Sequence, residues 1–100
     1  MIEAEFVEKL ERLETTSNHA ERHTLALELS DTGDQRVLSS LVRLVQLPHL
    51  QKWRGTLVFC LGSFDCSGIV DLLVTLVEND DGEASWTASG ILKEQRLVSQ

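Results

Sequence analysis

The sequence predicts an all-α domain, and three observations lead to that prediction. Apolar residues recur at intervals of three and four, as at Phe6, Leu10 and Leu13, and no segment sustains a strict alternation of apolar and polar residues. The apolar pattern repeats after about 32 residues. Turn-forming residues separate the apolar segments. Together these features predict six antiparallel helices within a single domain of 100 residues.

The helices can be justified in order along the chain. We expect them near residues 2–15, 19–30, 35–46, 50–62, 67–78 and 83–95. The first has the apolar face just described, and the third has another at Leu38, Leu41 and Val45. The turns between them fall at Gly33-Asp34, at Leu47-Pro48, from Asp65 to Gly68 and at Asn79-Asp80-Asp81-Gly82. These residues tolerate positive φ, cap helix starts or lack a backbone donor, so they end one helix and begin the next.

The repeat defines the organisation of the domain. When the sequence is aligned with itself, residues 37–46 match residues 69–78, and the same alignment places Arg22 on Arg54. An alignment one position longer carries Trp53 onto Trp86, and one that is a position shorter carries the first helix onto the third. The repeating unit is therefore a helical hairpin. The units are a half-repeat at 2–15, repeats at 19–46 and 50–78, and a terminal half-repeat at 83–95.

The segment Gly33-Asp34-Gln35-Arg36-Val37-Leu38, followed by Leu41, Leu44 and Val45, resembles HEAT-like repeats. Trp53-Arg54 and Leu61-Gly62 fit the other half of the unit, and the similarity is greatest to the short bacterial type related to phycobilisome-lyase repeats. This resemblance implies a short right-handed α-solenoid of about three helical hairpins. It also implies that the first helices lie on the convex side and that the second helices line a concave surface, which commonly holds other macromolecules.

The core is expected from the apolar positions that the repeat superposes. They are Leu25, Leu29, Leu38, Leu41, Leu44, Leu57, Leu61, Ile69, Leu73 and Leu76.

Charge and composition limit the class of partner. The net charge of −7 argues against nonspecific binding to nucleic acid or to an anionic membrane, because both require a basic surface. No apolar run approaches the roughly 20 residues of a membrane span, and the first residues are acidic where a signal peptide is basic. Cys60 and Cys66 form no CxxC pair, which favours reduced thiols. A cytoplasmic protein with a basic protein partner is therefore expected.

Several short motifs have a structural interpretation that we prefer. Asp31-Thr32-Gly33 matches the active-site tripeptide of aspartic proteases, but its helical surroundings favour an interhelical turn. His19 and His23 lack an evident third ligand, so they predict a surface pair and no metal site. The segment from Asn79 to Glu83 lacks the ligand pattern of a calcium loop and is also expected to be a turn.

The tryptophans and cysteines are likewise assigned to the fold. Trp53 and Trp86 occupy equivalent places at the start of the first helix of each unit, which favours structural packing over a role as interface anchors. Cys60 and Cys66 have no evident base nearby and are expected to be buried thiols. The sequence thus indicates no catalytic residue and no cofactor.

The candidate binding site is a set of polar positions on the inner helices, spaced by three and four so that each helix carries a stripe. These positions are Glu8, Arg12, Ser39, Arg43, Gln46, Asp71, Thr75 and Glu78, with Thr15 in the same register. Arg12 and Arg43 are expected to form a central row between acidic residues, which gives a surface of mixed charge. The alternative is an ordinary solvated face, which every surface helix needs.

The strongest acidity is expected beside this surface. It gathers on the first helix and around the last turn, at Glu3, Glu5, Glu8, Glu11, Glu14, Glu78, Asp80, Asp81 and Glu83. These clusters would steer a basic partner toward the inner surface.

We therefore predict a noncatalytic protein–protein interaction scaffold or adaptor. One specific hypothesis is an immunity-type inhibitor that occludes a basic enzyme such as a nuclease. The alternative is a subunit or partner of an enzyme complex, for which the family resemblance suggests a chromophore lyase. The two end helices have one neighbour each, so self-association through them is a further expectation.

Overall fold

The chain folds into helices joined by short turns. A computed structural model describes residues 1–79 and 82–97, and this part of the chain contains no strand. Its α-helices are α1 (Glu3–Thr15), α2 (His19–Ser30), α3 (Gln35–Val45), α4 (Gly55–Leu61), α5 (Val70–Asn79) and α6 (Glu83–Glu94). Two 3-10 segments, η1 (Pro48–Trp53) and η2 (Ser67–Ile69), precede α4 and α5. The prediction of an all-α fold is confirmed.

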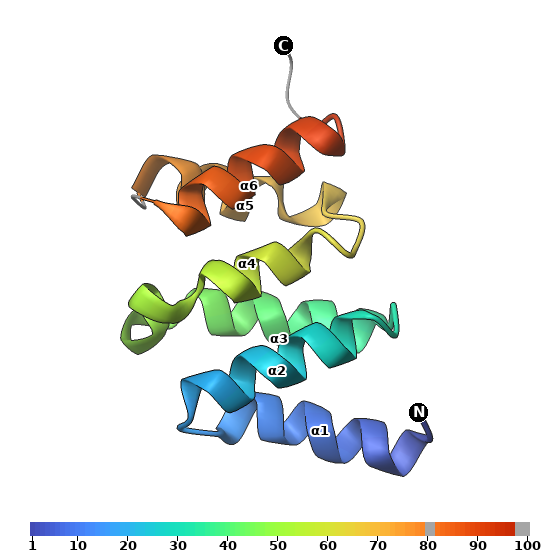
Figure 1. The fold of residues 1–100 in the computed structure, drawn as a ribbon. Helices are drawn as coiled ribbons and strands as arrows, with labels where there is room; N and C mark the ends of the chain where they lie inside the picture. Colours follow the sequence, from blue (N-terminus) through green and yellow to red (C-terminus); the bar gives the residue numbers. More distant parts are fainter. Residues whose placement is uncertain (80–81, 98–100) are drawn as a thin grey trace.

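The helices follow one another along the longest dimension of the molecule, which measures 43 × 25 × 16 Å. Figure 1 shows α1 at one end and α6 at the other. α1 packs on α2 and α3, α4 packs on α2, α3 and α6, and the principal contacts of α5 are with α6 and η2. Within the described ranges, no helix has both the length and the apolarity needed to cross a membrane.

One helix-capping contact recurs at the interval of the sequence repeat. Arg22 is buried, and its Nε donates to the carbonyl oxygen of Leu13 at 3.1 Å, near the end of α1. Arg54 Nη1 donates to the carbonyl oxygen of Val45 at 2.9 Å, at the end of α3. Donor and acceptor are both displaced by one full repeat between the two contacts. Each arginine satisfies a carbonyl that the helix itself leaves without a partner.

The pair formed by α5 and α6 satisfies the corresponding carbonyl with a different residue. Val77 lies one repeat after Val45, and its carbonyl oxygen accepts a hydrogen bond from Ser85 Oγ at 3.0 Å. The residue one repeat after Arg54 is Trp86, which cannot make the arginine contact. A short hydroxyl side chain one position earlier therefore takes the place of the long cation.

The prediction of one continuous helix at 50–62 is wrong. The structure divides this region into the 3-10 segment η1 and the short helix α4, with Arg54 between them at φ −94° and ψ −3°. Pro48 begins η1, where its fixed φ and missing N–H are tolerated. The apolar periodicity continues through both segments, so the apolar pattern does not mark the break, although Gly55 directly follows it. The helix expected at 67–78 similarly begins with the 3-10 turn η2.

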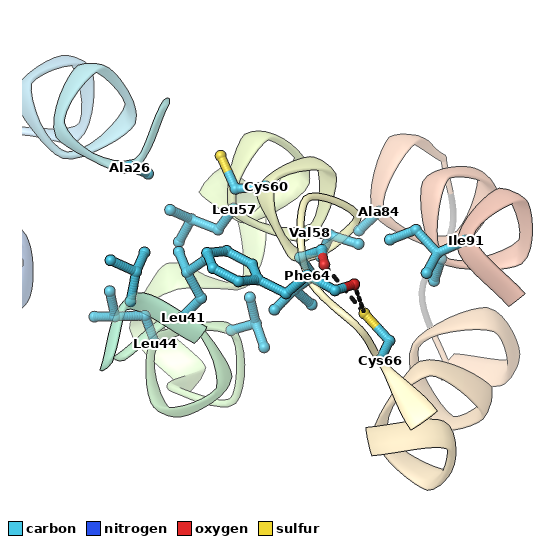
Figure 2. Packing of buried hydrophobic residues seen from close by; sticks show 14 of the residues in the cluster. Ala26, Leu41, Leu44, Leu57, Val58, Cys60, Phe64, Cys66, Ala84 and Ile91 are labelled. Carbon is cyan, nitrogen blue, oxygen red and sulfur yellow. Dashed lines mark hydrogen bonds between the residues drawn. The ribbon is translucent and has the colours of Figure 1, made fainter. Parts of the chain in front are cut away.

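The predicted core positions lie in or against the observed core. Seven of them are buried, namely Leu29, Leu41, Leu44, Leu57, Leu61, Leu73 and Leu76. Leu25, Leu38 and Ile69 are partly buried and pack against the same cluster. Figure 2 shows Phe64 reaching from the turn after α4 toward Leu41 and Leu57. Phe64 is only 5% exposed, so this turn contributes to the core as well as reversing the chain.

Candidate functional site

The predicted binding stripe lies on the surface in full. All eight of its residues are exposed, and α1, α3 and α5 supply them. They are Glu8 and Arg12 on α1, Ser39 and Arg43 on α3, Gln46 at the end of α3, and Asp71, Thr75 and Glu78 on α5. A contact between side chains of α1 and α3 joins the parts of the stripe that lie on these two helices.

That contact is an ion pair between α1 and α3. Arg43 donates from Nε to Glu14 Oε1 at 3.0 Å, and its Nη2 lies 2.9 Å from both oxygens of the same carboxylate. Ser40, which is buried, donates from Oγ to Glu14 Oε2 at 3.0 Å. Glu14 is therefore held from two positions on α3. The result is a fixed α1–α3 surface.

Each of the two arginines in the expected central row forms an ion pair with a carboxylate. Arg12 Nε donates to Glu21 Oε1 of α2 at 2.9 Å, and Arg43 is bound to Glu14 as described. Hydrogen bonds from Thr16 and Arg12 lower the pKa of Glu21, with that of Thr16 the larger cause. Both cations of the stripe therefore have a carboxylate partner within the chain.

The uncharged members of the stripe bond to their own helices. Gln46 Nε2 donates to the carbonyl oxygen of Val42 at 2.8 Å, and Thr75 Oγ1 donates to that of Asp71 at 2.9 Å. Ser39 Oγ makes a longer contact of 3.5 Å with the carbonyl oxygen of Gln35. These groups satisfy local acceptors and do not organise a shared site.

The remaining members of the stripe give it a negative character. Glu8, Asp71 and Glu78 form no ion pair with any residue in the described ranges. Since the two arginines are each matched by a carboxylate, these three side chains leave the stripe acidic. A mixed-charge, only slightly acidic surface was expected from the sequence. The stripe is more acidic than that because Glu14 and Glu21 reach the arginines from outside it.

The principal helix contacts do not join the α5 part of the stripe to the parts on α1 and α3. The main contacts of α5 are with α6 and η2, whereas α3 packs on α1, α2, α4 and η1. A single surface formed by all three stripes therefore stays a prediction. Asp80 and Asp81, which belong to the predicted acidic turn, lie outside the described residues.

Part of the acidity of α1 is also neutralised. Glu3 accepts hydrogen bonds from Arg36 at 2.8 and 3.0 Å, and this contact lowers the pKa of Glu3. Glu5 forms an ion pair with Lys9, which also binds Glu28 of α2. The acidic residues of α1 thus hold the N-terminal helices together as well as carrying charge.

The tripeptide Asp31-Thr32-Gly33 forms a turn, as predicted. Asp31 is the exposed C-terminal cap residue of α2, Thr32 Oγ1 donates to the carbonyl oxygen of Leu29 at 2.6 Å, and Gly33 has a φ of 70°. The equivalent position to Thr32 is Phe64, which is buried. The two turns therefore differ at this position, because Phe64 contributes to the core and the exposed Thr32 does not.

The two histidines on α2 contact a tryptophan. His19 stacks on Trp53, with ring centroids 4.3 Å apart, and His23 Nε2 donates to the carbonyl oxygen of Trp53 at 2.8 Å. In the described ranges no three His, Cys, Asp or Glu side chains are grouped to hold a metal ion. The pair serves to attach η1 to α2.

Both cysteines are buried thiols, as predicted. Burial raises the pKa of Cys60 and the pKa of Cys66, which disfavours the thiolate that a nucleophile requires. The Sγ of Cys66 donates to the carbonyl oxygens of Leu61 at 3.1 Å and Phe64 at 3.4 Å (Figure 2).

The expectation for Trp86 is wrong, and it leads to a surface that the sequence did not reveal. Trp86 is 81% exposed, whereas Trp53 is 47% exposed and stacked on His19. Trp86 lines a groove of about 590 Å³ between α4 and α6, together with Phe59, which is 61% exposed. Gly90, one turn after Trp86, was the available sequence signal, because it removes a side chain from the same face.

Comparisons with protein-family models, with curated proteins and with solved structures find no match for this chain.

Proposed function

We propose that the chain is a noncatalytic protein-binding module whose acidic inner stripe binds a basic protein. In this proposal the helical hairpins form a short, right-handed HEAT-like solenoid that acts in the cytoplasm. The capping contact that recurs from one hairpin to the next supports repeated hairpins, and two buried free thiols suit a reducing compartment. The HEAT-like character itself rests on the sequence resemblance described above.

The observation that carries the proposal is the pairing of Arg12 and Arg43 with Glu21 and Glu14. Once these cations are neutralised, the exposed charges available to a partner on the stripe are carboxylates. A basic protein would meet Glu8, Asp71 and Glu78 without displacing an internal ion pair. Opposite charge on the two partners accelerates association and suppresses binding of acidic competitors.

The partner class that this surface fits best is a basic enzyme, and the mode of action we favour is immunity-type inhibition by occlusion. An enzyme that acts on a polyanion must present cationic groups to phosphates. A rigid acidic module engages those groups without chemistry of its own. Charge pairs that lose their water at such an interface contribute roughly 1.5 to 7 kcal/mol in favourable cases.

Copurification from the native host identifies the partner, and charge reversal tests the surface. With Glu8→Lys, Asp71→Lys and Glu78→Lys combined, we expect association with the captured basic partner to slow by at least about tenfold at low salt. The difference should shrink as salt is added, because exposed charges are screened.

A matched variant controls for net charge. Asp31→Lys, Asp65→Lys and Glu94→Lys change the total charge by the same amount at exposed positions outside the stripe and outside the acidic clusters expected to steer a basic partner. We expect this control to retain most of the association rate, and circular dichroism should show similar helicity for both variants. Equal rates for the two variants, or capture of an acidic partner, would reject the stripe as the binding site.

A further inference from the structure

The groove between α4 and α6 differs from the acidic stripe in its chemistry. Phe59 and Trp86 are among the most exposed large apolar side chains of the chain, at 61% and 81%, and both line this groove. Large exposed aromatic side chains that line one groove are typical of interaction sites, whereas apolar side chains that are exposed singly are ordinary. The groove and the stripe lie on different helices, so this inference does not depend on the proposed function.

Gly90 forms an open position in the middle of this face. A Cβ added to Gly90 would meet no atom within 4 Å, so the fold does not require glycine there for space. Glycine inside an α-helix also destabilises it relative to alanine. The missing side chain leaves the backbone of α6 accessible, which permits another helix to approach closely.

The charges around the groove indicate which occupant fits. Its charged residues are Lys93 and Glu94, which are of opposite sign and form no ion pair with other described residues. The chain as a whole has a net charge of −7, so two copies repel each other over most of their surfaces. The groove is locally neutral. A second copy can therefore dock on the groove without placing like charges opposite each other. A basic partner, by contrast, is attracted to the acidic faces of the chain.

The residues of α6 are arranged so that the face complements itself. Trp86 lies four residues before Gly90 and Glu94 lies four residues after it, which is about 6 Å along the helix in each direction. A two-fold axis at Gly90 brings Trp86 of one copy opposite Lys93 and Glu94 of the other. The indole N–H then has a carboxylate acceptor, and the ring has a cation within reach. Each contact occurs twice, as an isologous interface requires.

We propose that two copies of this chain associate through the α4–α6 groove, with their α6 helices crossing at Gly90 and each Trp86 packing against Phe59 and the Lys93–Glu94 pair of the other copy. The groove is lined by α4, the turn that follows it and α6, so the interface is small. Interfaces of this kind are weak, and we expect a dissociation constant on the order of 1 to 100 µM.

Sedimentation of the full chain over a range of concentrations tests the proposal. The wild type should pass from monomer to dimer below about 1 mM. Trp86→Ala removes the exposed aromatic, and Gly90→Leu fills the crossing point with a residue of higher helix propensity, so each should weaken dimerisation at least tenfold while helicity is kept. Leu27→Ala is the matched control, because Leu27 is a 44% exposed apolar residue on α2 and should leave the dimer unchanged.

Fluorescence locates the interface independently. The chain has two tryptophans, so Trp86 is the sole tryptophan of the Trp53→Phe variant. Its emission should shift to shorter wavelength as the concentration rises through the dimerisation range. A monomer at all concentrations to about 1 mM overturns the proposal, and so does a dimer that Trp86→Ala and Gly90→Leu both leave intact.

Discussion

Single side chains decide how the ends of the helices are satisfied. Arg22, Arg54 and Ser85 each donate to a carbonyl near the end of the preceding α-helix. The acceptors are Leu13, Val45 and Val77, which are spaced by one repeat. The final carbonyls of a helix have no partner within it. The three contacts meet this requirement at the ends of α1, α3 and α5, which explains why a core of this size contains a buried cation.

Replacement of Arg22 should therefore be costly. Arg22 is 4% exposed and also donates from Nη2 to the carbonyl oxygen of Thr16. Arg22→Met keeps an unbranched apolar stem but leaves two acceptors without their donor, so we expect the free energy of unfolding to fall by about 2 to 3 kcal/mol. Arg12→Met, at an exposed ion pair, should cost less than about 1 kcal/mol. Urea denaturation measures both, and equal losses would contradict the capping role.

Asp34 should make stability sensitive to acid. Its side chain accepts hydrogen bonds from the side chain and the backbone N–H of Arg36, and these lower the pKa of Asp34 from its ordinary 3.8 to about 2. A lowered carboxyl pKa stabilises the fold above the ordinary value, and this contribution is lost as the pH falls toward 2.

The variant Asp34→Asn isolates this contribution. It keeps a capping acceptor but has no charge. Its melting temperature should lie below that of the wild type at pH 7, and the difference should close between about pH 4 and pH 2. A difference that is constant over this range would show that the charge of Asp34 does not contribute.

At the scale of the element, local sequence signals were sufficient for most helices. Residues 19–30 were predicted and observed as α2, and the expected helix at 83–95 corresponds to α6 (Glu83–Glu94). Asn18 caps the start of α2, Asp34 caps the start of α3 and Gly82 precedes α6, and all three residues fit caps and turns. The break at Arg54 was missed because it changes backbone geometry without interrupting the apolar period.

Two glycines should respond to alanine in opposite ways. Gly33 and Gly90 both have open space where a Cβ would lie, but Gly33 has a φ of 70°, whereas Gly90 lies within α6. Gly90→Ala should raise the free energy of unfolding by about 0.5 to 1 kcal/mol, because alanine loses less entropy in a helix. Gly33→Ala should lower it by about 1 to 2 kcal/mol, because an L-residue is strained at positive φ.

Denaturation of both variants measures these free energies of unfolding. It is followed at concentrations below the proposed dimerisation range, so that self-association does not contribute. A change of the same sign in both variants would show that φ does not determine the response.

The candidate surfaces were predictable to different degrees. Exposure of the inner stripe follows from helical periodicity, and the structure agrees at all eight positions. The ion pairs of Arg12 and Arg43 depend on how close α1 lies to α2 and α3, which periodicity does not specify. Trp86 was expected to pack because it matches Trp53 in the repeat. A repeat position fixes the face of a helix, but the residues on neighbouring helices decide whether that face is covered.

At the scale of the whole molecule, packing is distributed unevenly along the stack. α3 contacts α1, α2, α4 and η1, whereas the principal contacts of α5 are with α6 and η2 (Figure 1). If the chain has the repeat architecture proposed above, its stability is roughly a sum of unit terms and of terms between neighbours. The terminal hairpin formed by α5 and α6 therefore has fewer neighbours to stabilise it.

Hydrogen exchange should reveal this order. The slowest amides of α5 should exchange at least about tenfold faster than those of α3 and α4, because the terminal hairpin opens without unfolding the remainder. Leu73 and Leu41 are both fully buried leucines, one on α5 and one on α3, and each should lose about 2 to 5 kcal/mol on replacement by alanine. Leu73→Ala should accelerate exchange mainly in α5 and α6, whereas Leu41→Ala should accelerate it throughout the chain. The alternative outcome is uniform protection of the amides in the wild type and a uniform loss of that protection in both variants. It would show that the chain unfolds as one cooperative unit, in which the number of neighbouring helices has no local effect.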